Sequence, residues 1–257
     1  METLKIDGVS LEVQRLVGAA GQPRAAIVFL HEGLGSVAMW RDWPARLCGA
    51  TGRNGIVYSR RGYGESDRVP DVRTTGRLAP DYMHCEALEV LPQLLAALGI
   101  DRPVLLGHSD GGSIALIHAA HRPVSACVVM APHVIVEDVS VRAIEQARLT
   151  YLAGELRTRL QRYHADVDGA FWQWNDIWLE PLFRSFDIRA DCRLISAPVL
   201  AIQGLDDPYG TLRQIEEIAP TDGRFEMETL AGCGHSPHRD QSERTLARIA
   251  QFLLQVA

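Results

Sequence analysis

A serine with a glycine two positions away on each side lies between an apolar run and a helical pattern. Residues 107–111 read Gly-His-Ser-Asp-Gly, which has the form Gly-x-Ser-x-Gly. The apolar run 103–106 precedes them and the apolar helical stretch 114–117 follows. In a tight strand-to-helix turn, the two glycines avoid clashes and the serine hydroxyl is exposed above the sheet. The pattern therefore predicts a nucleophile at Ser109, with the N–H of Asp110 at a helix N-terminus, where it can face a developing oxyanion.

The pentapeptide alone is also typical of a glycine-rich turn without chemistry, so the rest of the chain must supply partners. A serine nucleophile needs a base, and the base needs an orienting carboxylate. One later turn contains Asp206 and Asp207 after the strand-like run 198–203, and the next such turn contains His235. Ligands of open α/β sheets bind at the carboxyl ends of strands, where these turns would meet Ser109. Either aspartate could therefore complete the set.

Strand-like and helix-like patterns alternate along the chain, which predicts an α/β fold with a mostly parallel sheet and helices on both faces. Alternation of apolar and polar residues at the start of the chain predicts an antiparallel beginning. The predicted strands are 9–16, 25–30, 55–59, 103–106, 125–130, 198–203 and 224–230, and the predicted helices are 40–48, 84–98 (despite Pro92), 110–120, 212–218 and 242–256.

A stretch without strand-like runs separates two of the predicted strands. We call residues 134–192 the cap segment, because its amphipathic, helical character predicts an inserted cap over the carboxyl edge of the sheet. Residues 1–133 and 193–257 then form one core domain. Trp172, Trp174 and Trp178, three of the five tryptophans, lie in the cap segment. Most of these rings would fill the cap's own small core, and one or two would line a substrate pocket below it.

Further segments carry a resemblance to a known family. Residues 30–36 (Leu-His-Glu-Gly-Leu-Gly-Ser) resemble the oxyanion loop of the α/β-hydrolase fold superfamily, and residues 59–66 (Ser-Arg-Arg-Gly-Tyr-Gly-Glu-Ser) resemble its Arg-Gly-x-Gly-x-Ser loop. The serine turn, the acid turn and the Gly-x-Gly-His turn follow in the family's order. The resemblance covers nearly the whole chain, and it implies an α/β-hydrolase fold with a helical cap.

The same resemblance implies roles for individual residues. Ser109 would be the nucleophile, and His235 the general base and then the general acid. Asp207 would hold the imidazole, because it takes the last place of a Gly-x-x-Asp pattern that begins at Gly204; the preceding aspartate is the alternative. Some relatives place this acid before the cap, so residues 137–138 (Glu-Asp) are a further alternative.

The oxyanion donors implied by the resemblance are the N–H of Asp110 and that of Gly33, with Leu34 as the neighbouring alternative. Two departures from the family pattern stand out. Glu32 replaces the glycine that commonly follows the loop histidine, which predicts a differently shaped oxyanion loop. Asp110 replaces a residue that is often apolar, and its carboxylate could either cap the following helix or recognise substrate.

Composition limits the partners of this chain. Its 26 Lys and Arg against 32 Asp and Glu include no basic run, so neither nucleic acid nor an anionic membrane surface is expected. No apolar window reaches the roughly 18 residues that span a membrane. The N-terminus lacks the pattern of a secretory signal, and the five cysteines include no Cys-x-x-Cys pair, so a reducing cytoplasm fits best. The oligomeric state is not predicted.

These observations predict a cofactor-free serine hydrolase that acts on a small carboxylic ester or lactone through an acyl-enzyme. No metal is expected, because Cys233, His235 and His238 have no second ligand cluster. A carbon–carbon bond hydrolase of a vinylogous diketone is one alternative, for which an arginine would have to hold the substrate carboxylate. The candidates for that role are Arg60, Arg61 and Arg184. A ligand-binding protein with little turnover is the other alternative.

Overall fold

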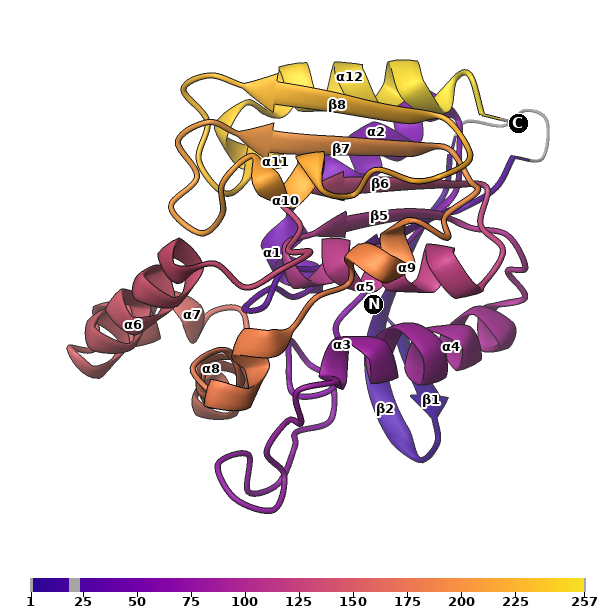
Figure 1. The fold of residues 1–257 in the computed structure, drawn as a ribbon. Coiled ribbons are helices and arrows are strands. Elements are labelled where there is room, and N and C mark those ends of the chain that lie inside the picture. Colours follow the sequence, from indigo (N-terminus) through magenta and orange to yellow (C-terminus); the bar gives the residue numbers. More distant parts are fainter. Residues whose placement is uncertain (1, 19–23, 257) are drawn as a thin grey trace.

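One mixed β-sheet forms the centre of the molecule (Figure 1). The computed structural model describes residues 2–18 and 24–256, and in them eight strands follow the order β1-β2-β4-β3-β5-β6-β7-β8. β2 runs antiparallel to β1 and β4, and the remaining neighbours are parallel, which confirms the predicted topology. The strands are β1 (Glu2–Ile6), β2 (Val9–Leu16), β3 (Ile27–Leu30), β4 (Gly55–Tyr58), β5 (Val104–His108), β6 (Ala126–Met130), β7 (Val199–Gly204) and β8 (Phe225–Leu230).

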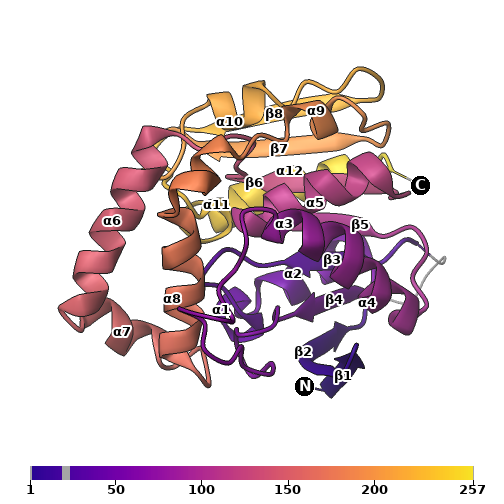
Figure 2. The ribbon, with the colours of Figure 1, turned by 60° about the horizontal axis from the view of Figure 1, so that its bottom comes forward.

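The helices lie on both faces of the sheet and beside its carboxyl edge (Figures 1 and 2). They are α1 (Val37–Trp40), α2 (Trp43–Thr51), α3 (Tyr82–Cys85), the π-helix η1 (Glu86–Val90), α4 (Leu91–Leu98), α5 (Asp110–His121), α6 (Asp138–Leu152), α7 (Glu155–Leu160), α8 (Val167–Trp178), the 3-10 helix η2 (Pro181–Ser185), α9 (Arg189–Cys192), α10 (Arg213–Glu216), α11 (Pro237–Asp240) and α12 (Ser242–Leu253). None of the helices in the described residues is long and apolar enough to cross a membrane.

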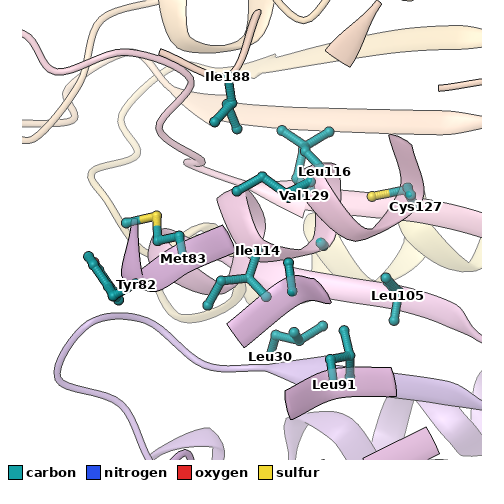
Figure 3. Packing of buried hydrophobic residues seen from close by; sticks show 14 of the residues in the cluster. Leu30, Tyr82, Met83, Leu91, Leu105, Ile114, Leu116, Cys127, Val129 and Ile188 are labelled. Carbon is teal, nitrogen blue, oxygen red and sulfur yellow. The ribbon is translucent and has the colours of Figure 1, made fainter. Parts of the chain in front are cut away.

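The central strands β3, β5, β6 and β7 consist entirely of buried residues. Side chains alternate across a strand, so each strand contributes to two cores. One core packs against α2 and α12, and the other against α4 and α5. Figure 3 shows part of the second core, where Leu30, Leu105 and Val129 of three neighbouring strands pack together with residues of α4 and α5. The continuous apolar runs of the sequence are explained by this burial on both faces.

The predicted helix 84–98 forms three joined segments, α3, η1 and α4. Pro92 lies at the start of α4 and has no N–H to donate to the preceding turn. The N–H of Leu91 bonds instead to the carbonyl of Glu86, five residues earlier, which produces the wider π turn. The predicted helix 40–48 is likewise divided, into α1 and α2, at Arg41, which has a φ of 55°.

The cap segment contains α6, α7, α8, η2 and α9, and its first helices lie beside the carboxyl ends of the strands (Figure 2). An antiparallel bridge between Ile135 and Asp187 joins its two ends next to the sheet. Tyr151 of α6 stacks on Phe171 of α8 with ring centroids 3.6 Å apart. Aromatic packing of this kind holds α6 against α8, and α8 passes over the serine turn.

Candidate active site

The serine turn joins β5 to α5 in a strained conformation. Ser109 has φ 53° and ψ −120°, a region that costs a non-glycine residue about 1–3 kcal/mol. A Cβ on Gly107 would lie 2.1 Å from the carbonyl oxygen of Gly111, and a Cβ on Gly111 would lie 2.1 Å from that of Leu30. Only glycine fits at either place. The N–H of Ser109 donates to the carbonyl of Met130 at 2.9 Å, which ties the turn to β6.

The turns after β7 and β8 bring an aspartate and a histidine together. Nδ1 of His235 lies 2.8 Å and 3.0 Å from the two carboxylate oxygens of Asp207. Asp207 also accepts from the side-chain amide of Gln203 at 2.7 Å and from the N–H of Tyr209 at 2.8 Å. A carboxylate can only accept, so Nδ1 carries a hydrogen in this contact and Nε2 is left available for base chemistry.

The Asp207 side chain is only 1% exposed, yet its carboxylate is ionised. Burial raises its pKa, but the hydrogen bonds from His235 and Tyr209 and the nearby imidazoles outweigh burial, so the pKa lies below its ordinary value. A fixed negative charge beside His235 favours the imidazolium that forms when a base accepts a proton.

The alternative acids lie elsewhere. Asp206 is exposed, one position before the residue that contacts His235. Glu137 accepts from the N–H of Thr211 at 2.9 Å, and Asp138 accepts from Arg184 at 2.7 Å. Among the described residues, neither forms a hydrogen bond or ion pair with the imidazole of His235.

A cavity of about 160 Å³ lies between the cap segment and the carboxyl ends of the strands. Ser109 and His235 both line it, although no hydrogen bond joins their side chains in the part of the chain that the structure describes. Such contacts often tighten only when substrate binds. The lining residues are Glu32, Gly33, Leu34, Ser109, Asp110, His133, Ile144, Trp174, Trp178, Tyr209, His235 and Ser236.

Five of the cavity-lining residues are not among the predicted site residues: Glu32 and Ser236, which are next to predicted residues in the sequence, and Ile144, His133 and Tyr209. Ile144 comes from α6, His133 follows β6, and Tyr209 follows the acid turn. Burial lowers the pKa of His133 to about 3, so its ring is neutral at neutral pH. His133 and Tyr209 could have been predicted as site residues because each follows a sheet strand. Ile144 could not, because only the packing of α6 over the sheet brings it to the cavity.

The predicted oxyanion residues surround the serine turn. Gly33 and Leu34 follow β3 and both line the cavity, so both N–H groups stay candidates for the second donor. A Cβ on Gly33 would lie 2.2 Å from Cδ1 and Nε1 of Trp174. Glycine at this position therefore allows the indole of α8 to close directly over the oxyanion loop.

The predicted tryptophans divide between two faces of α8. Trp174 and Trp178, one helical turn apart, line the cavity. Trp172 does not, because its ring lies 3.9 Å below the guanidinium of Arg73, on another face of the helix. The prediction that Trp172 lines the pocket is therefore wrong for this cavity, whereas Trp174 and Trp178 line it as predicted.

Both carboxylate oxygens of Asp110 accept from side chains outside α5, and among the described residues no backbone N–H of α5 donates to them, contrary to the capping interpretation. The donors are the hydroxyl of Tyr82 at 2.7 Å and Nε1 of Trp178 at 3.2 Å, and Arg60 lies 3.7 Å away. Burial raises the pKa of Asp110, and Arg60 and the two hydrogen bonds partly offset this. Asp110 thus anchors α8 and α3 to the serine turn.

Tyr82→Phe is expected to lower the free energy of unfolding by about 1.5–3 kcal/mol, the typical range for a hydrogen bond to a charged group. The substitution removes only the hydroxyl that donates to Asp110. Urea denaturation measures the effect, and Tyr58→Phe is the matched control, since its buried hydroxyl has no partner among the described residues. Equal stability of the Tyr82 variant and the wild type would contradict the anchoring role.

No arginine or lysine is among the residues that line this cavity. Arg60 is buried and donates to the carbonyl of His31 at 2.7 Å. Arg61 is exposed, and Arg184 pairs with Asp138 on the surface. The three arginines considered for a substrate carboxylate are therefore not available to it in this structure.

Among residues 2–18 and 24–256, no three histidine, cysteine or acidic side chains gather as a metal site would require. The five cysteines are free thiols.

Comparison with known proteins identifies the family of this chain. The sequence pattern of the alpha/beta hydrolase family matches residues 27–248. The chain belongs to this family. A curated relative from Mus musculus, the sn-1-specific diacylglycerol lipase ABHD11, is 26% identical over 281 aligned positions, which cover 98% of this chain and 88% of the relative. Its counterpart from Xenopus tropicalis is 25% identical, with 90% of this chain and 78% of the relative covered.

Solved structures of the alpha/beta hydrolase fold superimpose along the whole chain. The enol-lactonase from Burkholderia xenovorans has a TM-score of 0.75 at 20% identity, with 99% of this chain and 100% of that chain covered. A thermophilic esterase from Thermogutta terrifontis has a TM-score of 0.74 at 20% identity, with 98% and 96% covered. At these identities the likeness establishes the fold alone.

Proposed function

We propose that this alpha/beta hydrolase is a cofactor-free serine hydrolase of small, uncharged carboxylic esters or lactones. The observation that carries the proposal is the contact of 2.8 Å between His235 and Asp207, beside a cavity that the strained Ser109 also lines. A strained serine, an imidazole and a buried carboxylate in the family's chain order are the parts that acyl transfer requires.

In the proposed reaction, Oγ of Ser109 attacks the carbonyl carbon while Nε2 of His235 takes the hydroxyl proton. The carbonyl oxygen becomes an oxyanion, which the N–H groups of Asp110 and Gly33 stabilise. The tetrahedral intermediate then collapses, the ester C–O bond breaks, and His235 returns the proton to the leaving alcohol. Water attacks the acyl-enzyme by the same route and releases the acid.

The cavity supports an uncharged substrate. Its walls combine Leu34, Ile144, Trp174, Trp178 and Tyr209 with two acids and no basic side chain other than histidine. A substrate carboxylate would meet negative charge without a cationic partner, which is unfavourable in a buried site. The names of the mouse lipase, the esterase and the enol-lactonase all describe carboxylic ester cleavage, which supports the same bond class here.

A panel of esters and lactones with graded acyl length tests the proposal. We expect turnover of short, neutral acyl groups and at least about tenfold lower kcat/KM when the acyl chain ends in a carboxylate. Cleavage of a vinylogous diketone with no turnover of any ester or lactone would contradict it, as would binding of these compounds without turnover.

Within this proposal the cap segment sets acyl length through α8. Trp174→Ala removes the indole above the oxyanion loop, and we expect the preferred acyl chain to lengthen, with ratios of kcat/KM that change about tenfold or more. Trp172→Ala is the matched control on the same helix, because that ring lies outside the cavity. Identical acyl profiles for the two variants would contradict the assignment of Trp174.

A further inference from the structure

Three polar side chains outside the proposed catalytic set each adjoin a different part of it. His108 is the last residue of β5 and directly precedes Ser109. Glu32 directly precedes Gly33 in the oxyanion loop. Arg239 lies in α11, shortly after His235. We call His108, Glu32 and Arg239 the support cluster.

The support cluster makes two hydrogen bonds, one between His108 and the turn of His235 and one between Arg239 and Glu32. Nε2 of His108 lies 2.7 Å from the backbone carbonyl oxygen of His235. Nδ1 of His108 lies 3.3 Å from one carboxylate oxygen of Glu32. The other carboxylate oxygen of Glu32 accepts from Arg239 at 3.0 Å. A carbonyl oxygen can only accept, so Nε2 of His108 carries a hydrogen and donates it to His235.

Burial and charge keep this arrangement in one protonation state at neutral pH. The side chain of His108 is 1% exposed, and burial lowers its pKa to about 4, so the ring is neutral with its hydrogen on Nε2. Burial raises the pKa of Glu32, but positive charge close to it, including that of Arg239, outweighs burial, so the pKa lies below its ordinary value. The ring therefore donates to the His235 carbonyl through Nε2, whereas Nδ1, which carries no hydrogen, makes no hydrogen bond to Glu32.

We infer that His108, Glu32 and Arg239 are positioning residues. They fix the oxyanion loop, the serine turn and the turn that carries His235 relative to one another. The inference rests on the proposed function, in which Ser109, His235 and the N–H of Gly33 must meet one carbonyl group. A displacement of about 1 Å between such groups can cost about 10²-fold in rate. The inference also explains Glu32, which replaces a glycine common in the family: its carboxylate binds Arg239.

The decisive comparison is between two substitutions of His108. His108→Phe keeps an aromatic ring but removes the donor to His235, and we expect kcat to fall about 10²-fold while KM stays within about threefold. His108→Gln places an amide nitrogen near the position of Nε2, so it restores the donor. We expect it to recover kcat to within about tenfold of the wild type.

His238→Phe is the matched control. His238 is 3% exposed against 1% for His108, its ring centroid lies 4.9 Å from that of His108, and its buried Nδ1 has no hydrogen-bond partner among the described residues. This variant should keep kcat within about threefold of the wild type. If it loses as much activity as His108→Phe, aromatic packing explains the cluster and the inference is wrong.

Glu32→Gln provides a second test that does not depend on the folding of a core variant, since the side chain of Glu32 is 17% exposed. The amide keeps the shape and loses the charge that pairs with Arg239. We expect kcat to fall about tenfold with KM within about threefold. Unchanged kcat here, or in a folded His108→Phe variant, overturns the inference.

Labelling by a fluorophosphonate separates this inference from the proposed function. If the wild type is not labelled at Ser109, both the proposed function and the inference fail. If the wild type is labelled and His108→Phe is labelled equally fast, the inference alone fails. The expected result is slower labelling of His108→Phe, with the rate recovered in His108→Gln.

Discussion

Replacing Ser109 by alanine is expected to lower kcat/KM for esters by about 10⁴-fold or more. The substitution removes the oxygen that would form the acyl-enzyme and leaves Gly107 and Gly111, which shape the turn, in place. Oxyanion donors and the cavity would remain, so a residual rate above that in water is expected. Steady-state kinetics on the best ester measures the effect.

A loss of activity in Ser109→Ala supports the nucleophile assignment only if the variant is folded. Alanine fits the space of the serine at the same φ of 53°, so circular dichroism and the urea midpoint should match those of the wild type. A folded Ser109→Ala protein that retains wild-type turnover would contradict the nucleophile assignment. Loss of turnover together with retained substrate binding would match the proposed role.

Asp207→Asn is expected to lower kcat by about 10⁴-fold with little change in KM. An amide at this place can present its NH₂ group to Nδ1 of His235, which favours the wrong tautomer and removes the charge that stabilises the imidazolium. Asp206→Asn is the matched control on the neighbouring, exposed residue, and it should stay close to the wild type. A large loss in the control and none in Asp207→Asn would contradict the assignment.

The lowered pKa of Asp207 adds a pH-dependent expectation. A group with a folded pKa below its unfolded value contributes stability that is present above the unfolded pKa and is lost as the pH falls through the folded one. Asp207 should therefore stabilise the wild type at neutral and mildly acidic pH. The stability difference between wild type and Asp207→Asn should shrink only below the ordinary aspartate range, near pH 4.

Local sequence patterns were sufficient to predict the strands and turns that carry the site. Apolar runs marked the buried strands, and the strand–turn–helix context of Ser109 indicated the strained turn that the structure contains. Because parallel strands end at the same edge of the sheet, His235 and an aspartate of the acid turn could be named. The resemblance to the Gly-x-x-Asp pattern, and not the strand pattern, favoured Asp207 over Asp206. The antiparallel start was likewise visible in the alternation along residues 9–16, although β1 itself was not predicted.

Contacts between distant segments could not be derived in this way. The capping interpretation of Asp110 considered only its own helix, whereas its partners Tyr82 and Trp178 arrive from α3 and α8. Helical periodicity separates Trp172 from Trp174, but only the docking of α8 decides which face meets the cavity. The π turn before Pro92 required the backbone hydrogen bonds themselves.

The most direct test of the proposed function is the site of covalent modification by a fluorophosphonate. The reagent reacts with a serine only when base and oxyanion donors activate it, so the adduct marks the nucleophile. Intact-mass spectrometry of the wild type followed by peptide mapping should find one adduct, on Ser109, and none in Ser109→Ala. An adduct on another residue, or labelling that persists in Ser109→Ala, would contradict the account.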